Sequence, residues 1–417
     1  MQTAIDEADV VVVGGGIIGA SVAYHLTKAG INDVLVLERN ELAGGASARS
    51  AGCLIHTRSD ASSIKMIQRT RAAVKEMEQA LAEPLYLHER GSIRAVFNEA
   101  RANELITMEG VMKSTGIQVR EIDRHEAAEM VPWLELDGAT RAIFVPEDGY
   151  ADGALLTSAY SRSSKQNGAR YRRGVNVTKL LNDDNVITGV LTDDGPIRSK
   201  WVVVACGVWN VALARTLGIG FAGAPTRSHY WITAPDGSGD PSQPNIQLPD
   251  MRAYLRSEVG GVLLGMQEPQ TRTYDPMTLE NDMADMVLEE EEHDLELLYE
   301  QTRSLCDVIP KVDEWGFAHH IVGLSMYTPD GKFVIGRPAD SSGLVVAGGC
   351  CGSGLAASGG FGEIVADIVS GQPGNIDASI YDPNRFGPVD PTTDEFRKRC
   401  AAARSGKSRG NMSEDAA

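Results

Sequence analysis

Residues 9–39 read DVVVVGGGIIGASVAYHLTKAGINDVLVLER and decide the fold. The run VVVV predicts a buried strand, the amphipathic stretch that ends at Gly30 predicts a helix, and VLVLE predicts a second strand. Between the first strand and the helix stands the pattern Gly14-x-Gly16-x-x-Gly19. This order predicts a complete βαβ unit with a glycine-rich turn where the helix begins.

Each glycine of this pattern suits a different need of a bound dinucleotide. Gly14 permits the tight turn, Gly16 lets a pyrophosphate approach the backbone, and Gly19 lets the helix pack closely on the strand. The helix N-terminus presents free N–H groups to the phosphates. Glu38 ends the second strand 19 residues after Gly19, where a carboxylate receives ribose hydroxyls. The sequence therefore predicts dinucleotide binding.

The segments that follow favour FAD over NAD, since both cofactors present the same ADP half to the fingerprint. Residues 39–54 form a loop of Gly, Ala and Ser instead of the next helix of an NAD domain. Residues 174–210 have the pattern of a meander of short strands that ends in the buried strand WVVVA. Residues 343–371 again predict strand, glycine loop and helix, and this helix N-terminus would suit the N1/C2 carbonyl edge of a flavin.

Composition limits the class of protein. The chain has 417 residues, of which 42% are hydrophobic and 23% are charged. This length is enough for two or three hydrophobic cores. A formal charge of −18 repels phosphate backbones and anionic membrane surfaces, so we expect no nucleic-acid partner. The six cysteines show no CxxC pair or metal-ligand spacing, so we expect no metal and no disulfide framework. With no secretory signal and no bilayer-spanning stretch, we expect a cytoplasmic protein without membrane insertion.

These motifs resemble the D-amino-acid oxidase and sarcosine oxidase superfamily of FAD-dependent amine oxidoreductases, nearest its sarcosine and dimethylglycine dehydrogenase branch. The resemblance rests on VVVGGGIIGASVAYHLTKAG, VLVLER followed by AGGAS, VVVACGVWN, MYTPDGKFVIGR and AGGCCGSGLAASGGFGEIVAD. It implies an α/β (α+β) fold, in which a Rossmann-type FAD-binding domain is interleaved with a substrate domain built on a mostly antiparallel β-sheet. The expected FAD domain comprises residues 1–88, 146–220 and 322–385, and the expected substrate domain comprises residues 89–145 and 221–321, with a frayed tail at 386–417.

By match of position, the resemblance implies a set of FAD contacts. These are Gly14, Gly16, Ile18, Gly19, Glu38, Arg39, Ser47, Val177, Ala205, Gly207, Trp209, Gly352, Ser353 and Gly354.

The sequence departs from the family at four positions. The cysteine that tethers flavin in monomeric sarcosine oxidases aligns with Gly323, and the histidine that tethers it in dimethylglycine-type enzymes aligns with Arg49, so we expect non-covalent FAD. The lysine that holds the substrate carboxylate aligns with Ala356, and the lysine associated with oxygen activation aligns with Leu263. Oxidase activity loses support, and a dehydrogenase with another electron acceptor becomes at least as well supported.

Substrate-binding candidates come from segments that the family places over the flavin. Arginine is a suitable carboxylate clamp because its planar fork donates two parallel charged hydrogen bonds. Strand alternation puts Arg227 and His229 on one face of their strand, and Tyr254 and Arg256 on one face of theirs. An arginine on a strand makes a surface ion pair more often than it binds a ligand, so which arginine holds the substrate carboxylate stays open. The candidates are Arg49, Arg227, His229, Tyr254, Arg256 and Tyr327.

Two further features have local meanings. Asp152 or Gly153 is expected to cap a helix, and the acidic run around residues 289–298 to form a solvated helix face. His319 and His320 should point to opposite faces of a strand, so at most one lines a cavity.

Three functions remain open. The first is FAD-dependent oxidation of the C–N bond of a small secondary or tertiary amino acid, an N-methyl or imino acid, by hydride transfer to flavin N5 and hydrolysis of the imine. The second is an FAD enzyme for D-amino acids or 2-hydroxy acids, because the fold hosts both. The third is a flavin-bearing subunit of a multi-subunit oxidoreductase. The electron acceptor is O2 or another redox partner, and the protein is a monomer or a homo- or hetero-oligomer.

Overall fold

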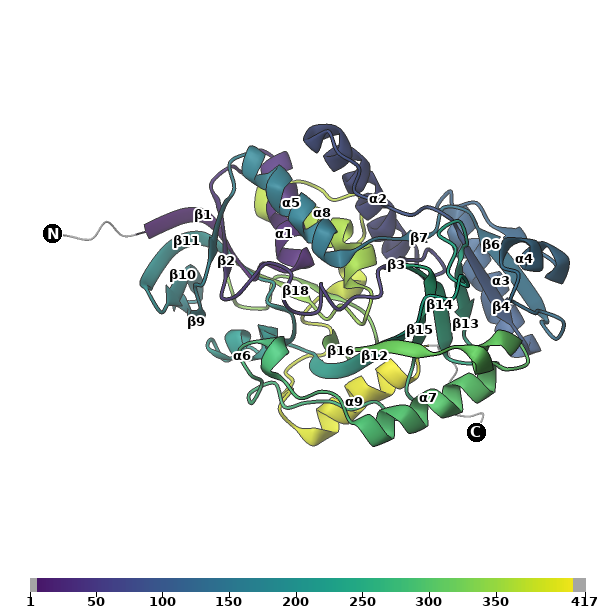
Figure 1. Ribbon diagram of the computed structural model, residues 1–417. Helices are drawn as coiled ribbons and strands as arrows, with labels where there is room; N and C mark the ends of the chain where they lie inside the picture. Colours follow the sequence, from purple (N-terminus) through teal and green to yellow (C-terminus); the bar gives the residue numbers. More distant parts are fainter. Residues whose placement is uncertain (1–5, 408–417) are drawn as a thin grey trace.

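A computed structural model describes residues 6–407 of the chain. In this part, two eight-stranded sheets lie at opposite sides of the molecule, and helices α1, α2, α5 and α8 cluster between and above them (Figure 1). The mixture of parallel and antiparallel strands confirms the α/β class predicted from the sequence. No helix of residues 6–407 is long and apolar enough to cross a bilayer.

The first sheet is built around the βαβ unit. Strands β1 and β2 pair in parallel, and β11 pairs in parallel with the other edge of β1. Helices α1, α2, α5 and α8 pack on one another and bury their apolar faces against this sheet. In spatial order its strands are β17 (Val334–Gly336), β18 (Leu344–Gly348), β11 (Gly195–Val204), β1 (Asp6–Val13), β2 (Val34–Glu38) and β8 (Arg170–Arg173), with β10 (Val186–Thr192) and β9 (Val177–Asp183) extending from β11. The helices are α1 (Ile17–Lys28), α2 (Ala61–Leu81), α5 (Gly153–Gln166) and α8 (Gly354–Ser370).

The second sheet is antiparallel except for one parallel pair, β13 with β4. Its strands are, in spatial order, β16 (Phe317–Tyr327), β12 (Ala224–Thr233), β15 (Gly261–Met266), β14 (Ala253–Glu258), β13 (Asn245–Leu248), β4 (Ser92–Val96), β6 (Arg141–Val145) and β5 (Arg120–Glu121). The remaining elements are the strand pair β3 (Cys53–Leu54) and β7 (Gly149–Tyr150), helices α3 (Glu99–Ser114), α4 (Arg124–Met130), α6 (Asn210–Arg215) and α7 (Glu291–Leu305), and the 3-10 turns η1 (Gly207–Trp209), η2 (Met283–Asp285), η3 (Pro310–Glu314) and η4 (Ser379–Tyr381).

The two sheets draw on interleaved parts of the chain. Strands from residues 89–145 and 221–321 enter the second sheet, and β1, β2, β8 to β11, β17 and β18 enter the first. One strand crosses an expected boundary, because β16 continues in the second sheet as far as Tyr327. We retain the two-domain division as a proposal, with all of β16 in the substrate domain.

The expectation of a frayed tail is wrong for helix α9 (Asp394–Ser405). Thr393 caps this helix by accepting a hydrogen bond from the Phe396 N–H, and α9 packs against β12 and β16 (Figure 1). Phe396 and Cys400 are 6% and 0% exposed. Their four-residue spacing places them on one helix face, and the polar residues around them hide this short apolar stripe in the sequence. Residues 408–417 of the expected tail lie outside the described residues.

Candidate functional site

A cavity of about 660 Å³ lies between the two sheets. Its lining on the first sheet includes Gly14, Gly16 and Glu38, and we call this the fingerprint side. Its lining on the second sheet includes Tyr254 and Tyr327, and we call this the sheet side. One continuous cavity therefore joins the glycine fingerprint to the antiparallel sheet.

The glycine turn leaves no space for side chains where strand and helix meet. Gly14 has φ +113°, and a Cβ there would lie 2.5 Å from the carbonyl oxygen of Ala205. A Cβ at Gly19 would lie 1.9 Å from the carbonyl oxygen of Gly14. The first glycine thus serves the turn and the third serves helix–strand contact, as their spacing predicts. Ser47 reaches the helix start, where its hydroxyl accepts a hydrogen bond from the Ile17 N–H at 2.9 Å.

The residues at the end of β2 form an ordered polar group. Glu38 Oε2 accepts from the Gly15 N–H at 2.7 Å, and Oε1 accepts from the Asn40 N–H at 2.9 Å. These bonds fix the carboxylate beside the glycine turn. The guanidinium of Arg39 lies 4.1 Å from the centre of the Trp209 ring, which holds both side chains at the wall of the cavity.

The structure brings the predicted cofactor contacts together. Gly19 is the exception, because it lies in the helix–strand contact and not on the cavity wall. The predicted cofactor contacts that line the cavity are Gly14, Gly16, Ile18, Glu38, Arg39, Ser47, Val177, Ala205, Gly207, Trp209, Gly352, Ser353 and Gly354.

The six substrate-binding candidates divide into two groups. Arg49, His229, Tyr254 and Tyr327 line the cavity, whereas Arg227 and Arg256 do not. Arg49 donates to the carbonyls of the glycine loop at residues 44–45. Burial raises the pKa of the Tyr327 phenol to about 12 and also raises the pKa of Tyr254, so both hydroxyls are protonated donors at neutral pH.

Arg227 has a different role from the predicted carboxylate clamp. Its side chain is 1% exposed and pairs with Glu268 Oε1 at 2.7 Å and with Asp294, while its Nε donates to the Leu288 carbonyl at 3.0 Å. The guanidinium is therefore occupied by two carboxylates between β12 and α7. The sequence could not reveal this, because Glu268 and Asp294 lie far from Arg227 along the chain.

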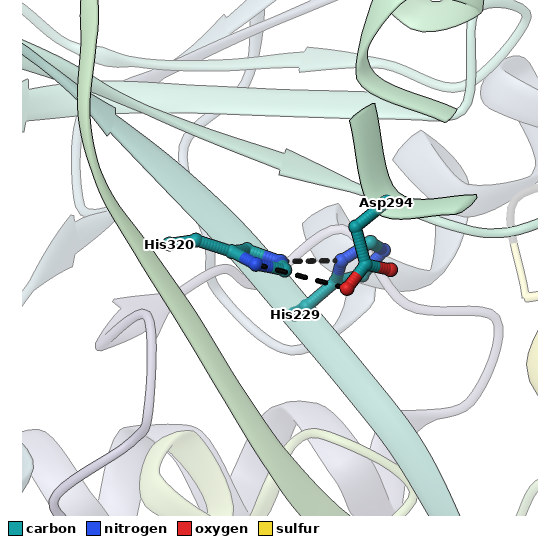
Figure 2. Close-up of side chains that lie close together, drawn as sticks. All are labelled: His229, Asp294 and His320. Atoms are coloured by element: carbon teal, nitrogen blue, oxygen red, sulfur yellow. Dashed lines mark hydrogen bonds and ion pairs between the residues drawn. The ribbon is translucent and has the colours of Figure 1, made fainter. Parts of the chain in front are cut away.

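His229 also belongs to this buried polar cluster. Figure 2 shows His320 reaching the ring of His229, with Nδ1 of His229 and Nε2 of His320 2.9 Å apart, and Asp294 close to both. Burial lowers the pKa of His229 to about 2 and that of His320 to about 4, so both rings are neutral at neutral pH. His319, in contrast, is exposed, as strand alternation predicts.

His229, Asp294 and His320 offer ligand atoms within 4.8 Å of one another, so they are close enough to hold a metal ion. Sequence spacing missed this group, because Asp294 comes from a separate helix. Arg227 pairs with the carboxylates of both Asp294 and Glu268, and burial raises the pKa of Glu268, so protein groups already hold both carboxylates. The absence of a metal therefore stays a prediction, and we interpret the cluster as a support beneath β12.

Arg256 is likewise occupied by protein groups. Its Nη1 lies 2.7 Å from Glu258 Oε2, its Nε donates to the Ala51 carbonyl at 2.6 Å, and its guanidinium lies 4.6 Å from the centre of the Tyr150 ring. These contacts join β14 to the loop before β3.

Three cavity-lining cations were absent from the predicted set: Arg58, Arg404 and Lys407. Arg58 follows β3 and reaches Ser353 Oγ at 3.5 Å. Arg404 and Lys407 come from α9 and the turn after it. The signal for Arg404 was available in the sequence, because it continues the four-residue spacing of Phe396 and Cys400.

Residues 9–368 match the DAO family, described as FAD dependent oxidoreductase. The match covers the fingerprint, both sheets and the loop before α8. The chain belongs to this family. It is an oxidoreductase, and FAD is its cofactor.

Two curated members of this family align with most of the chain. A 4-methylaminobutanoate oxidase (formaldehyde-forming) of Paenarthrobacter nicotinovorans is 30% identical over 381 residues, 90% of this chain and 45% of that protein. Human mitochondrial dimethylglycine dehydrogenase is 28% identical over 393 residues, 92% of this chain and 45% of that protein. The chain therefore spans a little under half the length of these relatives. The solved structure of L-proline dehydrogenase from P. horikoshii shares the fold, with TM-score 0.80, 23% identity, and coverage of 92% and 98% of the two chains.

The residues present suit the FAD of this family. Gly16 lies half-buried at the cavity wall beside the start of α1, where N–H groups can bind a diphosphate. Glu38 is placed for ribose hydroxyls, and the loop from Gly352 to Gly354 opens α8 toward the same cavity. The cavity continues beyond these groups to the sheet side, so it has room for a longer molecule than an ADP half.

Proposed function

We propose that the protein oxidises the C–N bond of a small secondary or tertiary amino acid, an N-methyl or imino acid, with non-covalent FAD. The observation that carries this proposal is the single cavity that joins the glycine fingerprint to a cation-rich wall on the sheet side. The named relatives that act on methylamino acids support the same class of substrate. The solved L-proline dehydrogenase supports only the fold.

The sheet side suits a small amine that carries a carboxylate. Arg49, Arg58 and Arg404 line the cavity, and none of them makes an ion pair with a carboxylate of residues 6–407. Cations without carboxylate partners attract an anionic group, and protonated phenols such as those of Tyr254 and Tyr327 can orient it. FAD, when bound, supplies the two-electron acceptor for the C–H bond next to nitrogen. The protein then orients the substrate and excludes water.

The positions expected to tether flavin lie side by side. A Cβ at Gly323 would be 3.0 Å from Cδ of Arg49, although the two residues are far apart in the sequence. Their proximity supports the alignment that matched both positions to flavin-tethering residues. Neither residue offers a thiol or imidazole, so we propose that FAD is held without a covalent bond.

An anaerobic absorbance titration tests the proposal. The purified protein is first precipitated with acid, and we expect the flavin to appear in the supernatant. The native protein is then titrated with sarcosine, dimethylglycine, 4-methylaminobutanoate and L-proline, and we expect one of these to bleach the flavin. D-alanine and lactate are the comparison substrates.

Each outcome decides between the functions. Bleaching by a D-amino acid or a 2-hydroxy acid alone would contradict the proposed substrate class. Bleaching by none of them would favour a flavin-bearing subunit that requires partner chains, and co-purification of such chains at fixed stoichiometry would support this reading. Readmission of air then separates an oxidase from a dehydrogenase by the speed at which the flavin colour returns.

A further inference from the structure

Helix α9 carries Arg404 to the cavity wall. The side chain is 5% exposed, its Nε donates to Ser228 Oγ at 3.3 Å, and its Nη2 donates to the Met266 carbonyl at 3.2 Å. Its Nη1 is buried and has no hydrogen-bond partner within residues 6–407. A buried guanidinium nitrogen without an acceptor is costly, so this donor is suited to an acceptor that enters the cavity.

Lys407 follows α9 and reaches the loop that opens α8. Its Nζ donates to the Cys351 carbonyl at 2.8 Å and to Ser353 Oγ at 3.4 Å, and it lies 6.0 Å from the centre of the Tyr327 ring. An ammonium group has three protons, so one donor remains. A Cβ at Gly352 would lie 3.0 Å from Nζ, so this glycine leaves room for the amine.

The charges around this pair do not balance. Neither Arg404 nor Lys407 pairs with a carboxylate of the described residues. The carboxylates that line the cavity belong to Glu38, Glu41 and Asp282, and they accompany Arg39 on the fingerprint side. In a chain of net charge −18, an unpaired cationic pair inside a cavity is an anion-binding arrangement.

We propose that Arg404 and Lys407 form the subsite that binds the substrate carboxylate. This inference rests on the proposed function and deepens it. The subsite replaces the glycine-loop lysine that the family resemblance leads one to expect at Ala356. Arg404 supplies a fixed donor from α9, and Lys407 supplies a second donor beside the loop of α8.

The ammonium of Lys407 also makes this subsite sensitive to pH. Lys407 is an exposed residue that lines the cavity, and protein atoms around its ammonium displace part of the water. Burial, with Arg58 and Arg404 nearby, lowers the pKa of Lys407 to about 7, while Cys351 and Cys53 act weakly in the other direction. The neighbouring Tyr327 stays protonated because its pKa is raised. Carboxylate binding requires the charged ammonium, so affinity should fall as pH rises above about 7.

The test measures binding without turnover. Cyclopentanecarboxylate has the shape of a proline-like acid but no nitrogen to oxidise, and cyclopentanecarboxamide is its neutral match. Both are titrated into the flavin-loaded protein by calorimetry. Lys407→Met should weaken carboxylate binding by at least about tenfold, because a charge-assisted hydrogen bond is lost. Binding of the amide should change by less than about twofold, since the amide carries no charge.

Two further variants separate charge from structure. Lys407→Arg keeps a cation, so it should retain most of the affinity and lose the fall above about pH 7. Lys398 is an exposed lysine of α9 that does not line the cavity, so Lys398→Met should leave both affinities unchanged.

Several results would overturn the subsite. One is that Lys407→Met weakens binding of the acid and of the amide equally, and another is that the unmodified protein does not bind the carboxylate. A third is that Lys407→Met binds the carboxylate normally but its reduced flavin reoxidises slowly in air. The last result would assign Lys407 to oxygen chemistry instead. If Lys407-dependent carboxylate binding persists while no amine bleaches the flavin, the proposed reaction fails and the subsite stands. If amines bleach the flavin and Lys407→Met changes no affinity, only the subsite fails.

Discussion

The fingerprint side of the cavity comes mainly from short continuous stretches, whereas the sheet side is assembled from segments that lie far apart. β1, the glycine turn, α1 and β2 follow one another within residues 6–38. On the sheet side, Arg49, Tyr254, Tyr327 and Lys407 come from a loop, two strands of the second sheet and the segment after α9. The first side is specified by local backbone geometry, and the second by long-range packing and charge pairing. The two sides should therefore respond differently to substitution.

The largest expected effect lies beneath the sheet side. Arg227→Met leaves Glu268 and Asp294 buried without their partner, and should lower the free energy of unfolding by about 3–5 kcal/mol. The matched control is Arg124→Met, which breaks an exposed pair with Asp137 and should cost less than about 1 kcal/mol. Urea unfolding of the flavin-loaded protein measures both. Unchanged stability together with lost carboxylate binding would restore Arg227 as the substrate clamp.

On the fingerprint side, Gly14→Ala should weaken flavin binding. A side chain at φ +113° costs about 1–2 kcal/mol, and its Cβ would clash with the Ala205 carbonyl at 2.5 Å. Gly30→Ala is the matched control, because Gly30 also has positive φ, +85°, but no atom lies within 4 Å of its Cβ position. The ratio of flavin to protein absorbance after dialysis measures retention. Equal flavin loss in both variants would attribute the effect to backbone strain alone.

Acid should destabilise both sides through buried histidines. Burial lowers the pKa of His25 in α1 to about 3 and that of His229 in β12 to about 2. The unfolded chain then binds more protons than the folded chain below about pH 6.5, so stability falls as pH drops, by about 2 kcal/mol per histidine between pH 7.5 and pH 5.

Thermal unfolding at several pH values measures this dependence. His25→Gln and His229→Gln should each reduce it, whereas His319→Gln, at an exposed site, should not. A pH profile that is the same in all three variants would contradict the assignment.

The smallest effect concerns a local cap. Asp152 accepts a hydrogen bond from the Leu155 N–H at 2.7 Å at the start of α5. Asp152→Ala should lower stability by about 1 kcal/mol, and Asp152→Asn should retain most of it, because asparagine also caps helices. Chemical denaturation distinguishes the two. Equal losses would show that the charge of Asp152, and not its cap, stabilises this region.

The pattern of these residues explains what could be predicted. Gly14, Gly19 and Asp152 act through atoms a few residues away or through an adjoining strand, so their roles can be predicted from their positions in the sequence pattern. Arg227 and Arg256 were predicted as clamps from strand position and from the family resemblance. Arg227 is held by Glu268 and Asp294, and Arg256 donates to the Ala51 carbonyl, and only folding brings these partners near. Arg404 and Lys407 were missed because a polar segment concealed a helix whose packing face contains few apolar residues.

By itself, the sequence determined the βαβ unit, the FAD fingerprint, the two kinds of sheet and the family, because these depend on short-range backbone geometry and hydrophobic periodicity. Only the tertiary structure decided which cations face the cavity. The charge of an arginine is the same in every strand, and its role depends on whether a carboxylate from another segment reaches it. Arg227 meets Glu268 and Asp294, whereas Arg404 and Lys407 meet none within residues 6–407 and remain available to a ligand.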